Sequence, residues 1–322
     1  MAKPSHIERT AHEPRRQQLH TLHINQITQV TPTVRLFQLS IPAEDRIEFL
    51  PGQWVDLYPP SDTGIVKPGG FTITSAPSAA SSDKNPYIEL AIQYSPENPV
   101  AAYLFRPAED LLHTPVSIRV GGSFVFPPPP VVDNDGKDGE QLQFRKVVFV
   151  AGGMGINPMM SMLSHIAESR ERYQGLEVRL LYTVKEPTPI SGAQGEGHDS
   201  IAWGVEQIQK SQGILFLDRI AELFTTTKLQ GQIQLFLTGG KKPTSAEGRR
   251  ANVLVQCGTR EVPALRRRMA IVDVEEAIGS DKDAIIVYIC GVPTMTDEFV
   301  EALVSPGGFG MEQSRVLCEK WW

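Results

Sequence analysis

The feature that most constrains the fold is an apolar run that ends in glycines and continues into a helix-like segment, at Val147–Leu163. The β-branched and apolar residues of Val147–Val150 predict a strand buried on both faces. The run stops at Gly152–Gly155, and Pro158 suits the start of a helix because its missing N–H costs nothing there. Apolar residues then recur at helical spacing over Met160–Ala167. The segment therefore predicts a strand, a glycine turn and a helix in direct succession.

Such a turn is a candidate phosphate site. Glycines let the backbone approach a ligand closely, and the free N–H groups at a helix N-terminus attract an anion. The alternative is a tight turn without a ligand, because a glycine-rich turn alone is weak evidence. The candidate residues are Gly152, Gly153, Met154, Gly155, Ile156, Asn157 and Pro158.

Composition narrows the chemistry. The chain has 322 residues, which suits two domains, and its net charge of −6 disfavours a nucleic-acid partner. No apolar run approaches the roughly 18–20 residues of a membrane span. The sparse cysteines Cys257, Cys290 and Cys318 favour a reducing compartment, and they are too few for an iron–sulfur cluster. Electron chemistry would thus need an organic cofactor, and the histidines show no ligand spacing that would predict a metal site.

Four segments are expected along the chain: a flexible tail at 1–20, a β-rich domain at 21–126, a proline-rich linker and loop at 127–143, and an α/β domain at 144–322. The tail is polar and has no sustained apolar face. It also lacks a secretory signal, so we expect an intracellular protein, with the cytoplasm favoured and the mitochondrion as the alternative.

The β-rich segment consists of short alternating runs separated by turn residues, which predicts an antiparallel barrel. The expected strands are Leu22–Ile27, Val34–Ile41, Trp54–Leu57, Phe71–Thr74, Ile88–Gln93 and Val116–Val120, with a helix at Val100–Arg106.

In the second half, expected strands alternate with expected helices, which predicts a parallel sheet covered by helices. The strands are Val147–Ala151, Glu177–Tyr182, Gly213–Asp218, Ile233–Thr238 and Ala284–Cys290; the helices are Pro158–Arg172, Ala202–Gln212, Pro263–Ile278 and Thr294–Leu303.

Ligands of an open parallel sheet bind at the carboxyl ends of its strands. Two further strand ends are therefore candidates: Thr183, and Cys290 with Gly291 and Val292. The alternative for Cys290 is a buried, inert thiol. The two terminal tryptophans, Trp321 and Trp322, are expected to pack on a flat apolar surface, which is either a ligand or the chain itself.

Taken in order, these features resemble the ferredoxin–NADP reductase superfamily, and more narrowly its oxidoreductase NAD-binding domain-containing proteins. The resemblance covers roughly residues 22–322. The motifs that carry it are Pro51-Gly52-Gln53-Trp54, the Phe71-Thr72 strand, Gly152–Pro158, Cys290-Gly291-Val292-Pro293 and the aromatic C-terminus. It implies a flavin-binding antiparallel barrel followed by a nicotinamide-nucleotide domain.

The resemblance also implies site residues. Phe71 would lie against the flavin ring and Thr72 would bond near its N5 atom. Other flavin contacts would come from Ile73, Thr74, Ala91, Ile92 and Gln93. The Gly152–Pro158 turn would hold the diphosphate of the nicotinamide nucleotide, and Cys290 would face the nicotinamide ring. Neighbouring nucleotide contacts would come from Thr183, Gly291, Val292 and Met295.

The C-terminus completes the implied site. Glu319 resembles the carboxylate that precedes the terminal aromatic residue, so that Thr72, Cys290 and Glu319 form the candidate catalytic set. Trp321 or Trp322 would cover the flavin until the nicotinamide displaces it.

Two positions depart from the motif. Gly69 stands where an arginine would bind the flavin diphosphate, and Ala101 replaces a serine or threonine that contacts the same phosphates. Both losses weaken charge pairing. The flavin is then held loosely, or Arg106 or Arg119 binds its phosphates. FAD is expected from the family, with FMN as the alternative.

The leading hypothesis is a flavin-dependent NAD(P)H oxidoreductase that passes electrons to an unknown acceptor such as a redox protein. The alternative is a non-catalytic nucleotide-binding or scaffold protein with a weakened flavin site. Lys241, Lys242, Arg249 and Arg250 are candidates for binding the 2′-phosphate of NADPH, or else form a solvated basic loop.

Overall fold

The structure is a computed structural model that describes residues 5–131, 141–187, 206–208, 211, 213–226, 228–239, 252–258 and 260–320. The chain forms two compact units. The first comprises Met1–Leu142 and Asn157–Glu168, and the second comprises Gln143–Ile156 and Ser169–Trp322. Helix α5 (Ile156–Glu168) thus groups almost entirely with the first unit, although the sequence places it after the glycine turn.

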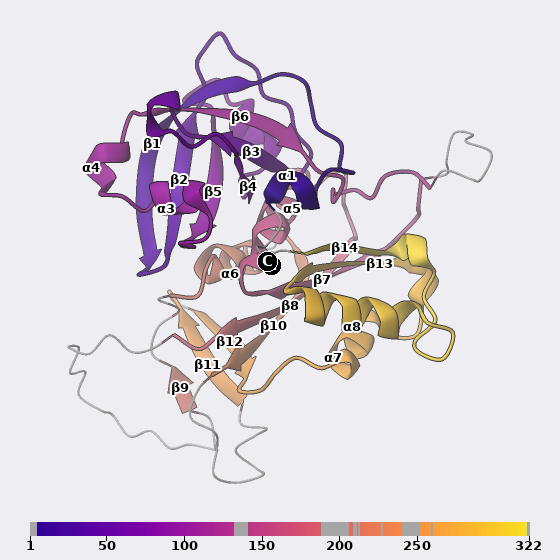
Figure 1. Ribbon diagram of the computed structural model, residues 1–322. Coiled ribbons are helices and arrows are strands. Elements are labelled where there is room, and N and C mark those ends of the chain that lie inside the picture. The colour runs from indigo at the N-terminus through magenta and orange to yellow at the C-terminus, as the bar shows by residue number, and fades with distance from the viewer. Residues whose placement is uncertain are drawn as a thin grey trace. The chain divides into compact units, whose positions relative to one another are not determined.

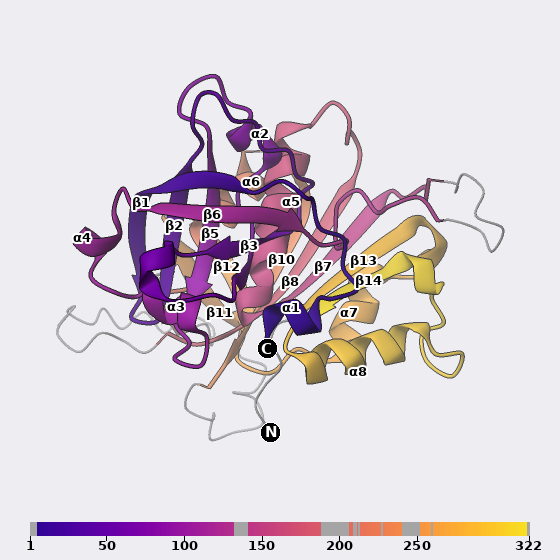
Figure 2. The ribbon, with the colours of Figure 1, turned by 45° about the horizontal axis from the view of Figure 1, so that its top comes forward.

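The first unit is built on an antiparallel sheet of six strands in the order β4-β3-β6-β1-β2-β5. Figure 2 shows these strands curving around a common interior. The two edge strands meet at an isolated bridge between Ile73 and Leu90, so the sheet curls toward a barrel. The strands are β1 (His20–Thr31), β2 (Val34–Ser40), β3 (Trp54–Tyr58), β4 (Gly69–Thr72), β5 (Tyr87–Gln93) and β6 (Pro115–Gly121).

All six strands overlap the strands expected from the sequence, and the expected barrel-like fold is confirmed. The reason is alternation: Leu22 and Ile24 on β1 face the interior while their neighbours are exposed. Short helices α2 (Pro77–Ala80), α3 (Pro99–Tyr103) and α4 (Ala108–Leu111) join the strands.

The segment expected to be a flexible tail contacts the first sheet, in the part of it that the structure describes. Helix α1 (His6–Arg9) packs on the sheet, and the ring of His6 meets that of Trp54 edge-on at 4.7 Å. His6 Nε2 lies 3.1 Å from the buried Asp56 Oδ1, and Arg15 Nε lies 3.0 Å from Asp56 Oδ2. His6 and Arg15 thus pair with a buried carboxylate, a partner that the sequence of the segment does not reveal.

The second unit has an eight-stranded sheet in the order β14-β13-β7-β8-β10-β12-β11-β9, and every pair except β11 with β12 is parallel. This confirms the expected α/β domain with a mainly parallel sheet. Its strands are β7 (Lys146–Gly152), β8 (Glu177–Lys185), β9 (Glu206–Ile208), β10 (Gln230–Thr238), β11 (Asn252–Cys257), β12 (Arg260–Leu265), β13 (Ile285–Gly291) and β14 (Val316–Lys320).

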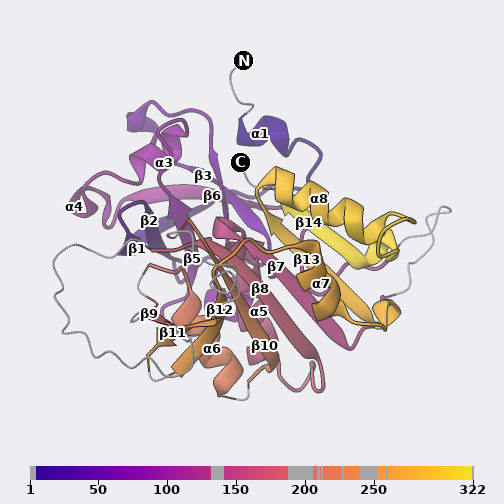
Figure 3. The same ribbon diagram turned by 90° about the horizontal axis from the view of Figure 1, so that it is seen from below.

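Helices α7 (Ile271–Ile278) and α8 (Pro293–Val304) run beside this sheet (Figures 1 and 3). Their apolar residues share one core with alternate residues of the central strands, including Val148 and Val150 of β7. Helix α6 (Leu217–Thr225) contacts β10 and β11. The sheet is thereby shielded where its strands are fully apolar.

Three expected elements differ from the structure. Gly213–Asp218 is not a strand but a turn that leads into α6, with Gly213 and Phe216 both at positive φ. The expected helix at Pro263–Ile278 begins only at Ile271, because Arg260–Leu265 pairs as β12. Within the expected helix at Ala202–Gln212, the described residues 206–208 form strand β9. Short apolar runs fit a strand, a turn or a helix equally well until their pairing partners are known.

Candidate functional site

The glycine turn leaves β7 and enters α5 through a single 3₁₀ turn at Gly153–Gly155. Gly153 has φ +55°, a left-handed conformation that favours glycine. Gly155 is required for another reason, since a Cβ there would lie 2.1 Å from the carbonyl oxygen of Cys290. The turn therefore lies directly against the end of β13, so the ends of β7 and β13 are close together.

The turn leads directly into the start of a long helix. Across the described residues, no side chain accepts a hydrogen bond from the amides of Gly153, Met154 or Gly155. The first amides of a 13-residue helix have no acceptor within the helix, which suits an anionic group. The start of this helix is therefore suited to a phosphate.

Cys290 and Glu319 are brought together by strand pairing. They are register partners on the parallel strands β13 and β14, so their side chains project from the same face of the sheet. Cys290 is fully buried. Burial is the main cause that holds the pKa of its thiol well above the usual value, and the negative charge of the nearby Glu319 adds to it. The thiol stays protonated near neutral pH and is no nucleophile.

Met295 on α8 covers the same strand ends. A Cβ on Gly291 would lie 2.5 Å from its methyl carbon, and a Cβ on Gly152 would lie 3.0 Å away. Val292, the residue after Gly291, is 57% exposed. Thr296, one residue after Met295, is fully buried, and its hydroxyl has no hydrogen-bond partner within the described part of the chain.

The remaining sequence candidates of the second unit divide into two groups. Thr183 pairs with Gly152 but lies inside β8, which continues to Lys185, so it is not at the strand end. Trp321 and Trp322 lie outside the described residues, as do the basic residues Lys241, Lys242, Arg249 and Arg250.

In the first unit, the segment Phe71–Thr74, which is expected to bind the flavin, contains one hydroxyl group without a hydrogen bond to a described residue. Thr72 is buried, and its hydroxyl makes no hydrogen bond with any residue that the structure describes. The hydroxyl of Thr74 instead donates to Glu89, at 2.9 Å from Oε1. Ile73 is fully buried at the bridge to Leu90. Thr72 is thus the hydroxyl on this strand that remains for a ligand.

Phe71, the residue expected to lie against the flavin ring, packs in the core of the first unit. It is 8% exposed and belongs to the barrel core. A Cβ on Gly69 would lie 2.7 Å from the Phe71 ring and 2.9 Å from Val100. The ring therefore occupies the space that a longer side chain at position 69 would need, which explains why glycine stands there.

The groups that could bind flavin phosphates are engaged by the chain itself. Asn98 caps α3 by accepting hydrogen bonds from Val100 N at 3.1 Å and Ala101 N at 3.2 Å. Arg119 pairs with Asp56 at 2.8 Å, and Arg106 pairs with Asp110 at 3.3 Å. Of the two arginines considered for the flavin phosphates, Arg119 is held by a buried carboxylate, whereas Arg106 makes only an exposed ion pair.

A contact that the sequence did not predict joins α5 to β5. The side-chain amide of Asn157 donates to Ala91 O at 3.0 Å, and the Ser161 hydroxyl donates to Ser75 O at 2.7 Å. Both donors are buried. The partners are 66 and 86 residues apart in the chain, so no local sequence signal could have revealed them.

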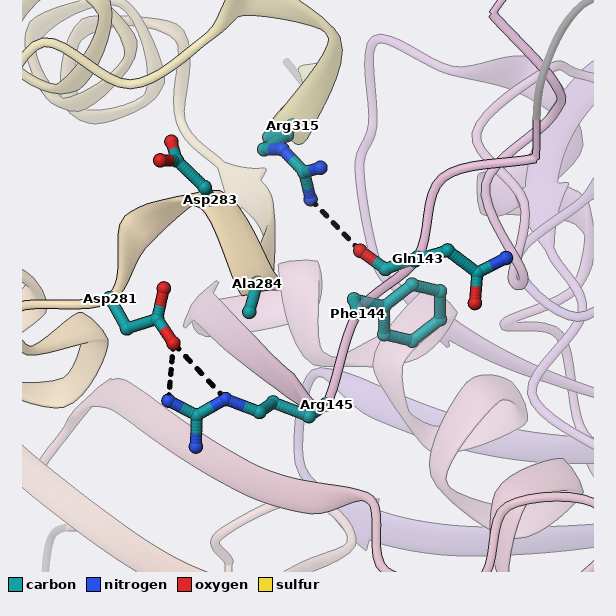
Figure 4. A pocket seen from close by; sticks show the side chains of 7 residues that line it. All are labelled: Gln143, Phe144, Arg145, Asp281, Asp283, Ala284 and Arg315. Atoms are coloured by element: carbon teal, nitrogen blue, oxygen red, sulfur yellow. Dashed lines mark hydrogen bonds and ion pairs between the residues drawn. The ribbon is translucent and has the colours of Figure 1, made fainter.

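A separate hollow of about 440 Å³ lies at the opposite, amino-terminal end of β7 and β13. Figure 4 shows Arg145 directed at Asp281 and Arg315 directed at the carbonyl of Gln143, contacts of 2.5 and 3.2 Å. Because these arginines are already paired and this end of a parallel sheet is not its ligand-binding end, we assign it no role.

Comparison with known proteins identifies the class of fold. The architecture is that of ferredoxin–NADP reductase-like flavoprotein reductases. A ferredoxin NADP⁺ reductase from Neisseria gonorrhoeae with bound FAD and NADP superposes with a TM-score of 0.61 at 16% identity, over 95% of this chain and all of that one (100%). The cytochrome b5 reductase domain of Ulva prolifera nitrate reductase superposes with a TM-score of 0.56 at 14% identity, over 94% of this chain and 98% of that one. No protein-family model matches the chain.

Homologues with a common name extend over nearly the whole chain. They are called Oxidoreductase NAD-binding domain-containing protein 1. The Bos taurus protein is 29% identical, over 99% of this chain and 86% of its own length. The Danio rerio protein is 27% identical, over 99% of this chain and 98% of its own length. The name that these relatives share refers to an oxidoreductase NAD-binding domain.

The described residues offer neither a membrane-spanning helix nor a metal-ligand cluster. No described helix combines the length and the apolar character that crossing a membrane requires. The described histidine, cysteine and carboxylate side chains form no group of three that could hold a metal ion.

Proposed function

We propose that this protein is a flavin-dependent NAD(P)H oxidoreductase. The observation that carries the proposal is the turn at Gly153–Gly155, where Gly153 takes a left-handed conformation and a Cβ on Gly155 would lie 2.1 Å from the Cys290 carbonyl oxygen. This arrangement offers a diphosphate a backbone cradle next to two strand ends. The residues of the turn would bind the nicotinamide nucleotide.

Three residues of the second unit would orient the nicotinamide ring. Cys290, as a neutral thiol, offers a small polarizable surface, and Met295 offers a flexible apolar one. Glu319, on the same sheet face as Cys290, would supply a negative charge that favours a ring gaining positive character.

The first unit would hold the flavin ring between β4 and β5. Thr72 would donate its free hydroxyl to the ring, and the backbone of Ala91–Gln93 would line it. When bound, the flavin supplies the hydride acceptor and the electron carrier that these side chains cannot provide. The acceptor that receives the electrons is proposed only by class, as a small molecule or redox protein.

The visible spectrum of the purified protein tests this function. We expect a flavin spectrum, from FAD or FMN, that bleaches when NADH or NADPH is added without oxygen. Mass spectrometry of the cofactor released on denaturation distinguishes FAD from FMN. A colourless protein that takes up no flavin on reconstitution would contradict the proposal.

A second candidate is a non-catalytic nucleotide-binding protein. It is favoured by the two departures from the flavin motif, Gly69 and Ala101, and by the pairing of Arg119 with Asp56. This protein would bind NAD(P)H at the glycine turn and no flavin. Calorimetric titration with NADH, NADPH, FAD and FMN separates the two candidates.

A further inference from the structure

The side chain of Asn157, at the start of α5, is buried and makes a hydrogen bond to β5. It is 95% buried (5% exposed), and its side chain is directed to β5 of the first unit, where its amide nitrogen donates to Ala91 O at 3.0 Å. A carbonyl can only accept, so the nitrogen of the carboxamide must be the atom facing Ala91. The other atom, Oδ1, is then an acceptor with a defined position.

That acceptor is unsatisfied. Asn157 Oδ1 is buried and has no hydrogen-bond partner among the residues that the structure describes. A buried polar atom without a partner is costly, and native proteins seldom retain one without a reason. The position therefore calls for a donor that a ligand brings.

The neighbouring Ser161 shows what a purely structural contact looks like. One turn further along α5, its hydroxyl donates to Ser75 O at 2.7 Å, and Ser161 leaves no buried atom unpaired. Both residues fasten α5 to the first unit. Only Asn157 also presents a spare acceptor, beside the strand expected to line the flavin.

The chemistry of the flavin identifies the donor. The oxidised isoalloxazine ring has a single N–H group, at N3, while its other polar ring atoms accept hydrogen bonds. An acceptor-only atom such as Asn157 Oδ1 can therefore pair with just that edge of the ring. We propose that Asn157 is a flavin-binding residue that accepts a hydrogen bond from flavin N3–H and anchors β5 through Ala91.

This assignment rests on the proposed flavin function and gives Asn157 a role different from that of its neighbours. Gly153–Gly155 would bind the nicotinamide nucleotide through backbone amides, whereas the side chain of the adjacent Asn157 would bind the flavin. One short segment would thus contact both cofactors.

The test pairs a change in the protein with a change in the ligand. The dissociation constants of FAD and of its 3-methyl analogue, which lacks the N3–H donor, are measured by flavin fluorescence for wild type, Asn157→Leu and Ser161→Ala. We expect wild type to bind the analogue about tenfold more weakly than FAD, the effect of one buried hydrogen bond. Asn157→Leu should bind FAD about tenfold more weakly than wild type and no longer discriminate against the analogue.

Ser161→Ala is the matched control, because it loses an α5 contact of the same kind but no acceptor. It should keep the wild-type preference for FAD. The inference is overturned if wild type binds FAD and its analogue equally, a result that needs no variant to fold, or if Asn157→Leu keeps the wild-type preference. Failure of wild type to bind FAD or FMN would instead refute the proposed function, and with it this role.

Discussion

Asp56 is a fully buried carboxylate on β3, held by three cationic or protonatable partners. Burial alone would raise its pKa, but hydrogen bonds from His6, Arg119 and Arg15 outweigh that effect and hold the pKa below its usual value. Substituting Asp56→Asn leaves two arginines without their counter-charge. We expect a loss of about 3 kcal/mol in the free energy of unfolding, measured by urea denaturation.

The exposed pair of Arg106 and Asp110 provides the control, since its side chains are 55% and 43% exposed. Asp110→Asn should change the free energy of unfolding by less than about 0.5 kcal/mol. Equal effects of the two substitutions would show that the Asp56 cluster adds nothing to stability.

The pH dependence of stability follows from the same carboxylate. Because the pKa of Asp56 is lower in the folded than in the unfolded protein, its contribution is fully present above the unfolded value of about 3.9 and is lost as the pH falls through the folded pKa. Wild type should therefore lose more stability than Asp56→Asn between about pH 5 and pH 2. Parallel pH profiles of the two proteins would contradict this.

The three thiols should differ in reactivity. Burial raises the pKa of Cys257 to about 12 and that of Cys290 well above its usual value, whereas Cys318 is exposed and its pKa is raised less. We expect iodoacetamide to modify Cys318 first under native conditions, as peptide mass spectrometry would show. Preferential labelling of Cys290 would mean that its surroundings are open and polar.

Among the elements, the glycine turn depends on close approach of two strand ends. Gly155→Ala would bring a methyl group to 2.1 Å from the Cys290 carbonyl oxygen, so the turn must shift. We expect affinity for NAD(P)H to fall at least about tenfold, because displaced amides no longer converge on the diphosphate. Calorimetric titration measures it.

Gly307→Ala is the matched control for the turn. Gly307 has open space around it and no positive φ, so alanine fits there without strain. Its nucleotide affinity should equal that of wild type. Unchanged binding in Gly155→Ala would remove the turn from the nucleotide site.

The N-terminal element contributes to stability although its sequence is polar. Removing residues 1–16 takes away His6 and Arg15, which contact Asp56 and the ring of Trp54. We expect the melting temperature to drop by about 5–10 °C, from the loss of a buried ion pair. Removing only residues 1–4 should leave it nearly unchanged; equal effects of both deletions would refute the assigned contacts.

At the scale of the whole molecule, the two units have separate hydrophobic cores. A ligand that binds one unit stabilises that unit by mass action. NAD(P)H at a hundredfold excess over its dissociation constant should add about 2.7 kcal/mol to the unit that carries the glycine turn. Scanning calorimetry should show this as an upward shift of one unfolding transition, and no shift at saturating nucleotide would count against the site.

The strands of both sheets show how far sequence patterns reach. Alternation located every strand of the first unit, and apolar runs located β7, β8, β10 and β13. The same reasoning missed β14, at Val316–Lys320, and misassigned Gly213–Asp218. An edge strand has partners on one side only, so its own pattern is weak, and a short apolar turn resembles a strand until its backbone is seen.

The sequence by itself determined the order of the two units and the position of the glycine turn, because strand, turn and helix preferences depend on neighbouring residues. Tertiary structure alone decided that Asn157 reaches Ala91, that Arg119 is taken up by Asp56, and that Cys290 shares a sheet face with Glu319. Those contacts join residues 66, 63 and 29 positions apart along the chain, where local propensity has no influence and packing selects the partner.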